Sequence, residues 1–296
     1  MRRQVAGPEA VRGLRWWWQL IVQVTKQLQA HNAELLAGGV AMYGLLSVFP
    51  GLAAAVSIYG LFATPDDVIQ HLRVFAGVLP PGVWEIFSTQ LQEVVAHDHG
   101  TLTVAATIGV LIALWSARLT MSALMVATTI AYEHQEKRGF LYQLLTSLIL
   151  TLGLIVGFVV MLLIGVVVPL VVAVLGTSPS IQLLVDVLRW LLLWAFAVIG
   201  LSVVYHYAPA REHARWRWAS LGSVLAATLW LAVSGLFSLY VRTVAGYDRT
   251  YGALGGVVVL LMWFYLLSFI VVVGAEVNAV LDQRSLRSDR RTHPRG

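Results

Sequence analysis

Six long apolar stretches fill the chain from residue 35 to residue 281. An α-helix rises about 1.5 Å per residue, so about 20 apolar residues cross a hydrocarbon layer of about 30 Å. The chain is 58% hydrophobic and only 12% charged, which is typical of a protein embedded in a bilayer. The predicted spans cover residues 35–63, 101–127, 141–176, 187–207, 218–240 and 253–281.

The apolar runs are continuous and do not alternate with polar residues, as the strands of a membrane β-barrel would. We therefore predict an all-α, polytopic integral membrane protein: a six-helix transmembrane bundle with amphipathic interfacial helices. Residues 1–34 form an N-terminal cytoplasmic segment, residues 35–283 the transmembrane domain, and residues 284–296 a basic cytoplasmic tail. An outer amphipathic loop is predicted over residues 64–100.

The basic residues are distributed unevenly across this topology. Of the 20 Lys and Arg residues, 15 fall on one side of the bundle. They are Arg2, Arg3, Arg12, Arg15, Lys26, Lys137, Arg138, Arg211, Arg215, Arg217, Arg284, Arg287, Arg290, Arg291 and Arg295. The positive-inside rule then places both termini in the cytoplasm. Because topology accounts for the net charge of +5, we expect no nucleic-acid partner.

Residues 9–32 have a helical pattern with one apolar face. Leu14, Trp17, Ile21, Val24 and Leu28 recur at helical spacing among basic and amide side chains. Three consecutive tryptophans, residues 16–18, suit the headgroup layer of a membrane. We predict a helix lying on the cytoplasmic surface, in contact with membrane lipids.

Polar side chains recur on single faces of several spans and form candidate substrate-path positions. Such residues serve helix packing or line a wet path, and the pattern alone leaves both readings open. The candidates are Tyr43, Ser47, Arg118, Ser122, Tyr251, Tyr265, Ser268, Glu276 and Asn278.

Arg118 and Glu276 are the ionisable candidates, because an unpaired charge in a bilayer is costly. Counted from the outer ends of their spans, Arg118 is 17 residues deep and Glu276 is 23 residues deep. Both positions then fall toward the cytoplasmic side, at about 25 Å or more from the outer end. We predict that the two side chains pair with each other. The alternatives are that Arg118 reaches cytoplasmic headgroups and that Glu276 is solvated.

Motifs for catalysis and for metal or cofactor binding are missing from the sequence. There is no cysteine, no phosphate-binding glycine loop, no nucleophile elbow and no zinc-protease motif. His97, Asp98 and His99 form a local triplet, which rarely supplies convergent metal ligands. We expect no catalytic residue, metal or cofactor.

Four sequence stretches carry a resemblance to a known family. They lie at residues 41–50, at 114–117 with Tyr132 and 138–140, at 251–255 and at 274–279. Together they resemble the YihY/BrkB family of bacterial inner-membrane proteins, over about residues 15–282 and including the six-span layout. Thr128 and Thr129 depart from the Leu-Asn often found there, and the position of Arg118 varies among relatives.

The resemblance implies a multi-pass protein of the bacterial inner (plasma) membrane and cell envelope, in a virulence-associated family. Relatives carry the label ribonuclease BN, for which this sequence offers no hydrolase site. Others are linked to serum resistance or to export of lipid A precursors, which favours lipid transport.

Our leading hypothesis is a transporter or flippase of lipids or envelope precursors, with an anionic lipid or amphiphile as substrate. Arg118 would meet the headgroup, while Glu276 and Asn278 would hold a cytoplasmic gate. The alternative is a non-transporting scaffold or envelope assembly factor, with small-residue seams that serve packing or a homo-oligomer. A membrane-bound enzyme is a third possibility.

The predicted topology can be tested with reporter fusions. A reporter fused at His97 should report the outer side of the membrane, and one fused after Leu281 should report the cytoplasm. Activity of both fusions on the same side would contradict the six-span topology.

Overall fold

The computed structural model describes residues 8–60, 99–167, 178–210, 219–244 and 253–292, together with Val172. Every regular element in these ranges is a helix, which confirms the all-α prediction. The elements are α1 (Pro8–Ala30), α2 (Ala33–Gly60), α5 (His99–Ala131), α6 (Phe140–Leu162), the π-helix η1 (Leu163–Val167), α8 (Pro179–Tyr207), α9 (Leu221–Val244) and α11 (Ala253–Thr292).

Six of these helices contain an apolar stretch long enough to cross a membrane, as predicted. The stretches are Ala33–Ala55, Thr107–Ala131, Phe140–Gly165, Ser180–Tyr207, Leu221–Tyr240 and Gly255–Ser285. Several helices extend beyond the predicted spans: α5 begins at His99, α8 begins at Pro179, α9 ends at Val244, and α11 continues to Thr292 through most of the predicted tail. The predicted outer loop lies almost wholly outside the described residues.

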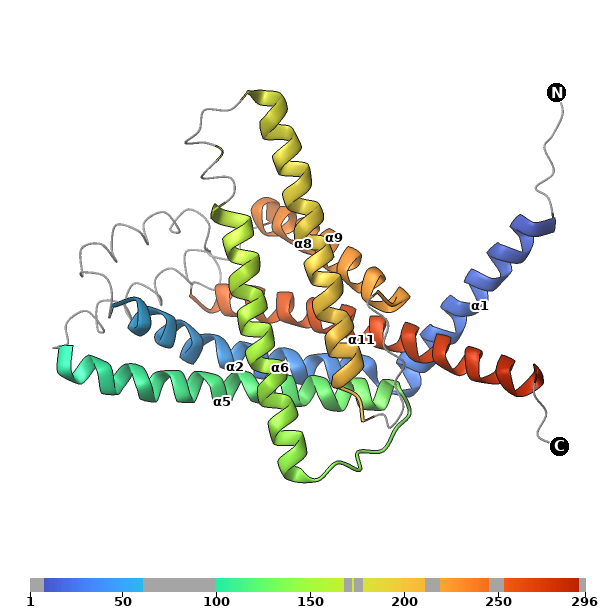
Figure 1. Ribbon diagram of the computed structural model, residues 1–296, viewed down its shortest axis with the longest axis horizontal. Coiled ribbons are helices and arrows are strands. Elements are labelled where there is room, and N and C mark those ends of the chain that lie inside the picture. Colours follow the sequence, from blue (N-terminus) through green and yellow to red (C-terminus); the bar gives the residue numbers. More distant parts are fainter. Residues whose placement is uncertain are drawn as a thin grey trace.

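The helices form two groups that cross each other (Figure 1). The first group is α2, α5 and α11, which lie side by side, with α2 running opposite to the other two. The neighbouring helices α6 and α8 cross this group at a steep angle, and α9 packs between α8 and α11. The start of α1 and the end of α11 lie at the same end of the first group, as an even number of spans requires.

The outer surface of the bundle is strongly apolar. On α6, only Ser147, Leu150 and Thr151 are buried, while large side chains such as Ile149 and Phe158 are exposed. A helix that is apolar on its exposed faces belongs in contact with lipid. The π-helix η1 continues α6, two residues before Pro169, which is outside the described residues.

A close contact between helices joins α9 to α11 at Gly222 and Gly274. A Cβ atom on Gly222 would overlap the carbonyl oxygen of Gly274 and come within 2.6 Å of Asn278 Cγ. Asn278 Oδ1 accepts a hydrogen bond from the Gly222 backbone N–H (2.9 Å), and its Nδ2 donates to Ser220 Oγ (2.9 Å). Small residues permit this approach, and the amide fixes its register.

Helix α1 docks on the last part of α11 through an apolar contact. Leu20 and Val24 are buried against Val277 and Val280. Arg284 Nη2 also donates to Gln23 Oε1 (3.0 Å), which joins the two helices through polar atoms. Trp16, Trp17 and Trp18 on α1 remain exposed, which leaves them free for the predicted contact with headgroups.

Replacing Gly222 with alanine tests the α9–α11 contact. The added methyl group would meet backbone and the Asn278 amide, neither of which can give way cheaply. We expect Gly222→Ala to destabilise the purified protein by about 1–3 kcal/mol, measured as thermal unfolding in detergent.

Gly153→Ala on α6 is the matched control, because nothing lies within 4 Å of the Cβ that it would add. Alanine favours helix over glycine by up to about 1 kcal/mol, so stability should be unchanged or higher. Equal losses in both variants would show that Gly222 is not a packing constraint.

Candidate functional site

A short break between α1 and α2 positions the first functional side chain. Asn32 adopts the left-handed conformation (φ 50°), which asparagine tolerates better than most residues. The His31 N–H still donates to Gln27 O (2.8 Å), while Asn32 O already accepts from the Leu35 N–H (2.9 Å). The chain therefore leaves one helix and enters the next within two residues, and His31 is held at the joint.

His31 contacts Glu276, which comes from the opposite end of the sequence. His31 Nδ1 lies 2.7 Å from Glu276 Oε1, the distance of a strong hydrogen bond or ion pair. The Glu276 side chain is fully buried, whereas that of His31 is 17% exposed. Glu276 Oε2 is buried and has no hydrogen-bond partner in the described structure. This carboxyl group is therefore only half satisfied.

Gln27 and Glu133 extend the polar cluster at the same end of the bundle. Gln27 lies one turn before His31 on α1, and its Nε2 donates to Glu133 Oε1 (3.1 Å). Glu133 follows α5 and is left-handed (φ 55°), with its N–H donating to Ile130 O (2.8 Å), so it closes the helix. Gln27 Oε1 is a second buried acceptor without a partner.

Arg118 lies within the apolar stretch of α5, 13 residues or about 20 Å before the helix ends at Ala131. Its guanidinium lies over the ring of Trp115, 4.5 Å from the centroid, and its Nε is buried without a hydrogen-bond partner.

The predicted pair of Arg118 with Glu276 is wrong, because Glu276 is paired with His31 instead. Helices α5 and α11 run in the same direction, and Ala127 and Val272 belong to one buried cluster. Arg118 lies nine residues before Ala127, and Glu276 lies four residues beyond Val272. The two charges therefore lie on opposite sides of this cluster along the helices. The error arose from equating depth with sequence distance from an assumed span start.

The remaining candidate positions fall into three groups. Tyr43 is 43% exposed, Ser47 donates to Gly44 O (2.7 Å), and Ser122 is half-buried. On α11, Ser268 is buried, and Tyr265 stacks on Phe269 with ring centroids 6.2 Å apart. Asn278 is engaged in the α9–α11 contact, and Tyr251 lies outside the described residues. Their role in a substrate path stays a prediction.

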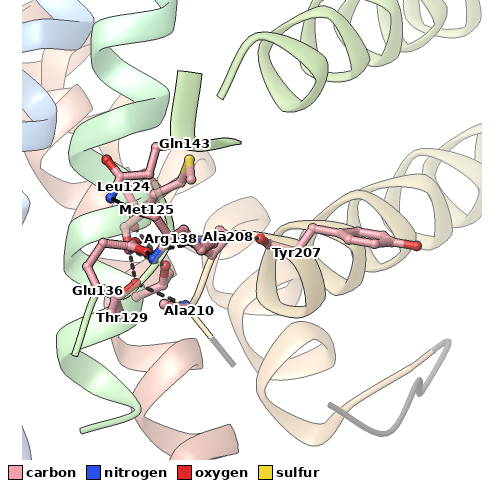
Figure 2. Close-up of polar contacts among 10 residues, drawn as sticks. Leu124, Met125, Thr129, Glu136, Arg138, Gln143, Tyr207, Ala208 and Ala210 are labelled. Carbon is pink, nitrogen blue, oxygen red and sulfur yellow. Dashed lines mark hydrogen bonds and ion pairs between the residues drawn. The ribbon is translucent and has the colours of Figure 1, made fainter. Parts of the chain in front are cut away.

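Arg138 anchors the connection between α5 and α6 to the end of α8 (Figure 2). Its Nη2 donates to Ala208 O (2.9 Å), and its Nη1 donates to Tyr207 O (3.3 Å). These carbonyls lie at a helix C-terminus, where a cation is favourable. Nε and Nη2 also donate to the two oxygens of Glu136, at 2.8 and 2.7 Å. The hydrogen bonds from Arg138 hold the pKa of Glu136 below its usual value. Arg138 thus has a structural role.

His31 is the residue that sequence reasoning missed. The available signal was the polar pair His31-Asn32 between an amphipathic segment and an apolar one. The predicted N-terminal segment includes His31, but no functional role was predicted for this residue. In the described part of the chain, no three His, Cys, Asp or Glu side chains are placed to hold a metal ion. His97 and Asp98 of the loop triplet are outside that part.

Comparisons with known proteins assign the chain to a family of membrane proteins. The family profile described as Virulence factor BrkB matches residues 24–296. A UPF0761 membrane protein of Vibrio cholerae is 31% identical over 294 residues, covering 95% of this chain and 91% of that protein. A Bacillus subtilis protein, YfkH, whose name describes it as ribonuclease-like, is 30% identical over 264 residues, covering 88% and 94%. No solved structure matches the chain.

A double-mutant cycle tests which charges are coupled. Because His31 and Glu276 are in contact, His31→Ala and Glu276→Gln should show an interaction energy of about 0.5–3 kcal/mol in unfolding measurements. Arg118→Leu with Glu276→Gln is the control cycle, and its two effects should add within about 0.5 kcal/mol. An interaction energy found only in the control cycle would support the predicted pair of Arg118 with Glu276.

Proposed function

The chain belongs to the virulence factor BrkB family of membrane proteins, and from that premise we propose that it moves an anionic lipid or a similar envelope amphiphile across the bilayer. We place it in the bacterial inner membrane with both termini in the cytoplasm, as its basic residues favour.

Arg118 carries this proposal. An arginine near the centre of a bilayer costs at least about 2.5 kcal/mol even on the most lenient scale. The Trp115 ring offsets part of that cost, at about 0.5–2 kcal/mol for a cation–π contact. The described structure gives Arg118 no carboxylate partner, and Arg118 lies about 20 Å before the end of α5, which is farther than its side chain extends. An anionic headgroup within the membrane would complete its coordination.

The surroundings of Arg118 fit a lipid that moves along the protein surface. Trp115 is 54% exposed and Arg118 is half-buried, so this pair of side chains extends to the lipid-facing surface of α5. Helices α2 and α5 pack side by side, so Ser47 and Arg118 belong to neighbouring helices. In this proposal, a headgroup bound by Arg118 moves along these two helices.

Lipid movement can be measured in liposomes that contain the purified protein. A phosphatidylglycerol with a fluorescent headgroup is bleached by dithionite only in the outer leaflet, so further bleaching reports movement. We expect Arg118→Gln to slow this movement by about 10-fold or more, because a hydrogen bond to a charged group is worth about 1.5–3 kcal/mol.

Arg189→Gln is the matched control. Arg189 also lies near a tryptophan, Trp190, at 5.8 Å, but it has a carboxylate partner in Asp186 at 3.2 Å. Its removal should leave lipid movement unchanged. Equal rates in wild type, Arg118→Gln and protein-free liposomes would refute a lipid transporter.

A non-transporting scaffold is the second candidate, and the α9–α11 contact favours it. A chain of side-chain hydrogen bonds runs from Asn278 through Ser220 and Ser223 to Ser202, with Ser202 Oγ donating to Ser223 Oγ at 2.9 Å. These polar groups satisfy one another and so support packing. A scaffold would retain its fold and family interactions without moving any lipid.

We further expect no ribonuclease activity, although YfkH has a ribonuclease-like name. The described residues bring together no metal-binding group that could activate water. The purified protein should leave RNA intact with magnesium, manganese or zinc. RNA cleavage that co-purifies with the protein and is lost in His97→Ala or His99→Ala would contradict this.

A further inference from the structure

We propose that Glu276 and His31 form a proton-binding site, through which a proton gradient drives lipid movement. The proton is held at Glu276 and reaches it through the ring of His31. The coupling to transport rests on the function proposed above, whereas the binding of the proton does not.

The polar cluster around the pair lacks hydrogen-bond donors. Glu276 Oε2 and Gln27 Oε1 are both buried acceptors without a partner. The amide donor of Gln27 is used by Glu133, and Nδ1 of His31 faces Glu276 Oε1. A buried polar atom left unpaired is unfavourable, because it has lost its hydrogen bonds to water. A proton on the carboxyl group supplies the cluster with a donor.

The charge of the pair leads to the same conclusion. With neutral His31, ionised Glu276 leaves one negative charge fully buried within a membrane span. Such a charge is costly unless it is compensated, and a neutral imidazole compensates only through a hydrogen bond. The nearby carboxylate of Glu133 adds repulsion. One added proton makes the pair neutral.

None of the neighbouring charged or titratable groups described below donates a positive charge to Glu276. At the end of α5 these are Glu133 and Tyr132, and along α11 the next is Asp282. Tyr205 of α8 donates to Val271 O of α11 (2.8 Å). Lys26 of α1 and Glu34 of α2 flank His31 in sequence but are exposed. Helix α9 faces α11 with Gly222 and serines.

A proton relay follows from the geometry of the pair. Before transfer, the Nδ1–H bond of neutral His31 donates to the ionised Oε1 of Glu276, 2.7 Å away. A proton from water then binds His31 Nε2, because the ring is 17% exposed. The Nδ1–H bond breaks as an Oε1–H bond forms. His31 ends neutral with its proton on Nε2, Glu276 ends as a carboxylic acid, and one proton has been taken up.

A proton fits this site better than a metal ion. Hard cations take about six or more oxygen ligands, whereas the pair supplies a single carboxylate beside an imidazole. No third acidic or histidine side chain joins them as a ligand in the described residues.

The pair also connects three helices, because His31 lies at the joint of α1 and α2 and Glu276 lies on α11. In this proposal, protonation of Glu276 therefore changes a contact between the three helices.

Infrared difference spectroscopy of the full-length protein in lipid nanodiscs tests the site without any assay of transport. Acidification from about pH 9 to about pH 6 leaves ordinary exposed carboxylates ionised. We expect the wild type to gain the C=O band of one carboxylic acid, and Glu276→Gln to lack it. The amide of that variant resembles the protonated acid in shape, so the fold should persist.

Controls make each outcome decisive. Asp186→Asn removes an exposed carboxylate and should keep the band. His31→Gln can still donate to Glu276 but cannot relay a proton, so after a pH jump the band should appear on the order of 100-fold more slowly. No band in the wild type, or the same band in Glu276→Gln, would overturn the site. Loss of the band on adding sodium at constant pH would show that the site binds a metal cation in place of a proton.

The coupling is tested in the liposome assay with a pH gradient across the membrane. We expect the gradient to change the rate of phosphatidylglycerol movement several-fold in wild type and in Asp186→Asn, and Glu276→Gln to abolish the response. An infrared band without any lipid movement would refute the proposed function but keep the proton site. Lipid movement that ignores the gradient would refute the coupling alone.

Discussion

The close approach of α9 to α11 at Gly222 and Gly274 fixes the position of the helix on which the candidate proton site depends. Gly274 and Asn278 are four residues apart and lie on one face of α11, against α9. Glu276 lies between them in sequence, and the helical turn points it to the opposite face, toward the α1–α2 joint. Packing on one side of α11 therefore sets the depth and direction of the carboxyl group on the other. A shift of α11 by one residue would remove the contact with His31.

Glu276 and Arg118 are placed in contrasting ways. Glu276 is fully buried in the bundle and has a protein partner, His31. Arg118 lies on a helix surface near exposed Trp115, with a buried Nε that no hydrogen bond satisfies. Glu276 therefore relies on partners within the protein, whereas the remaining partners of Arg118 must come from the membrane. In the proposed mechanism, this separation would let Arg118 bind a substrate while Glu276 exchanges a proton.

The sequence was sufficient for the helical class and the number of spans, because hydrocarbon thickness sets the length of an apolar run. It also indicated that Glu276 and Arg118 were unusual. It could not pair them correctly, because the partner of Glu276 is a histidine 245 residues away whose position depends on a left-handed Asn32. Span ends were also uncertain, since α5 and α11 continue as helices beyond their apolar segments. Contacts between distant helices depend on register, which hydropathy does not encode.

The left-handed Asn32 also gives α1 the geometry of a lever. The 23 residues of α1 measure about 34 Å, and the helix is joined to α2 through only two residues. A change of about 10° at this joint would move the exposed tryptophans, about 20 Å along α1 from the joint, by about 3–4 Å. A sub-ångström change between His31 and Glu276 at the pivot would thus be magnified at the membrane surface, where Trp16–Trp18 are exposed.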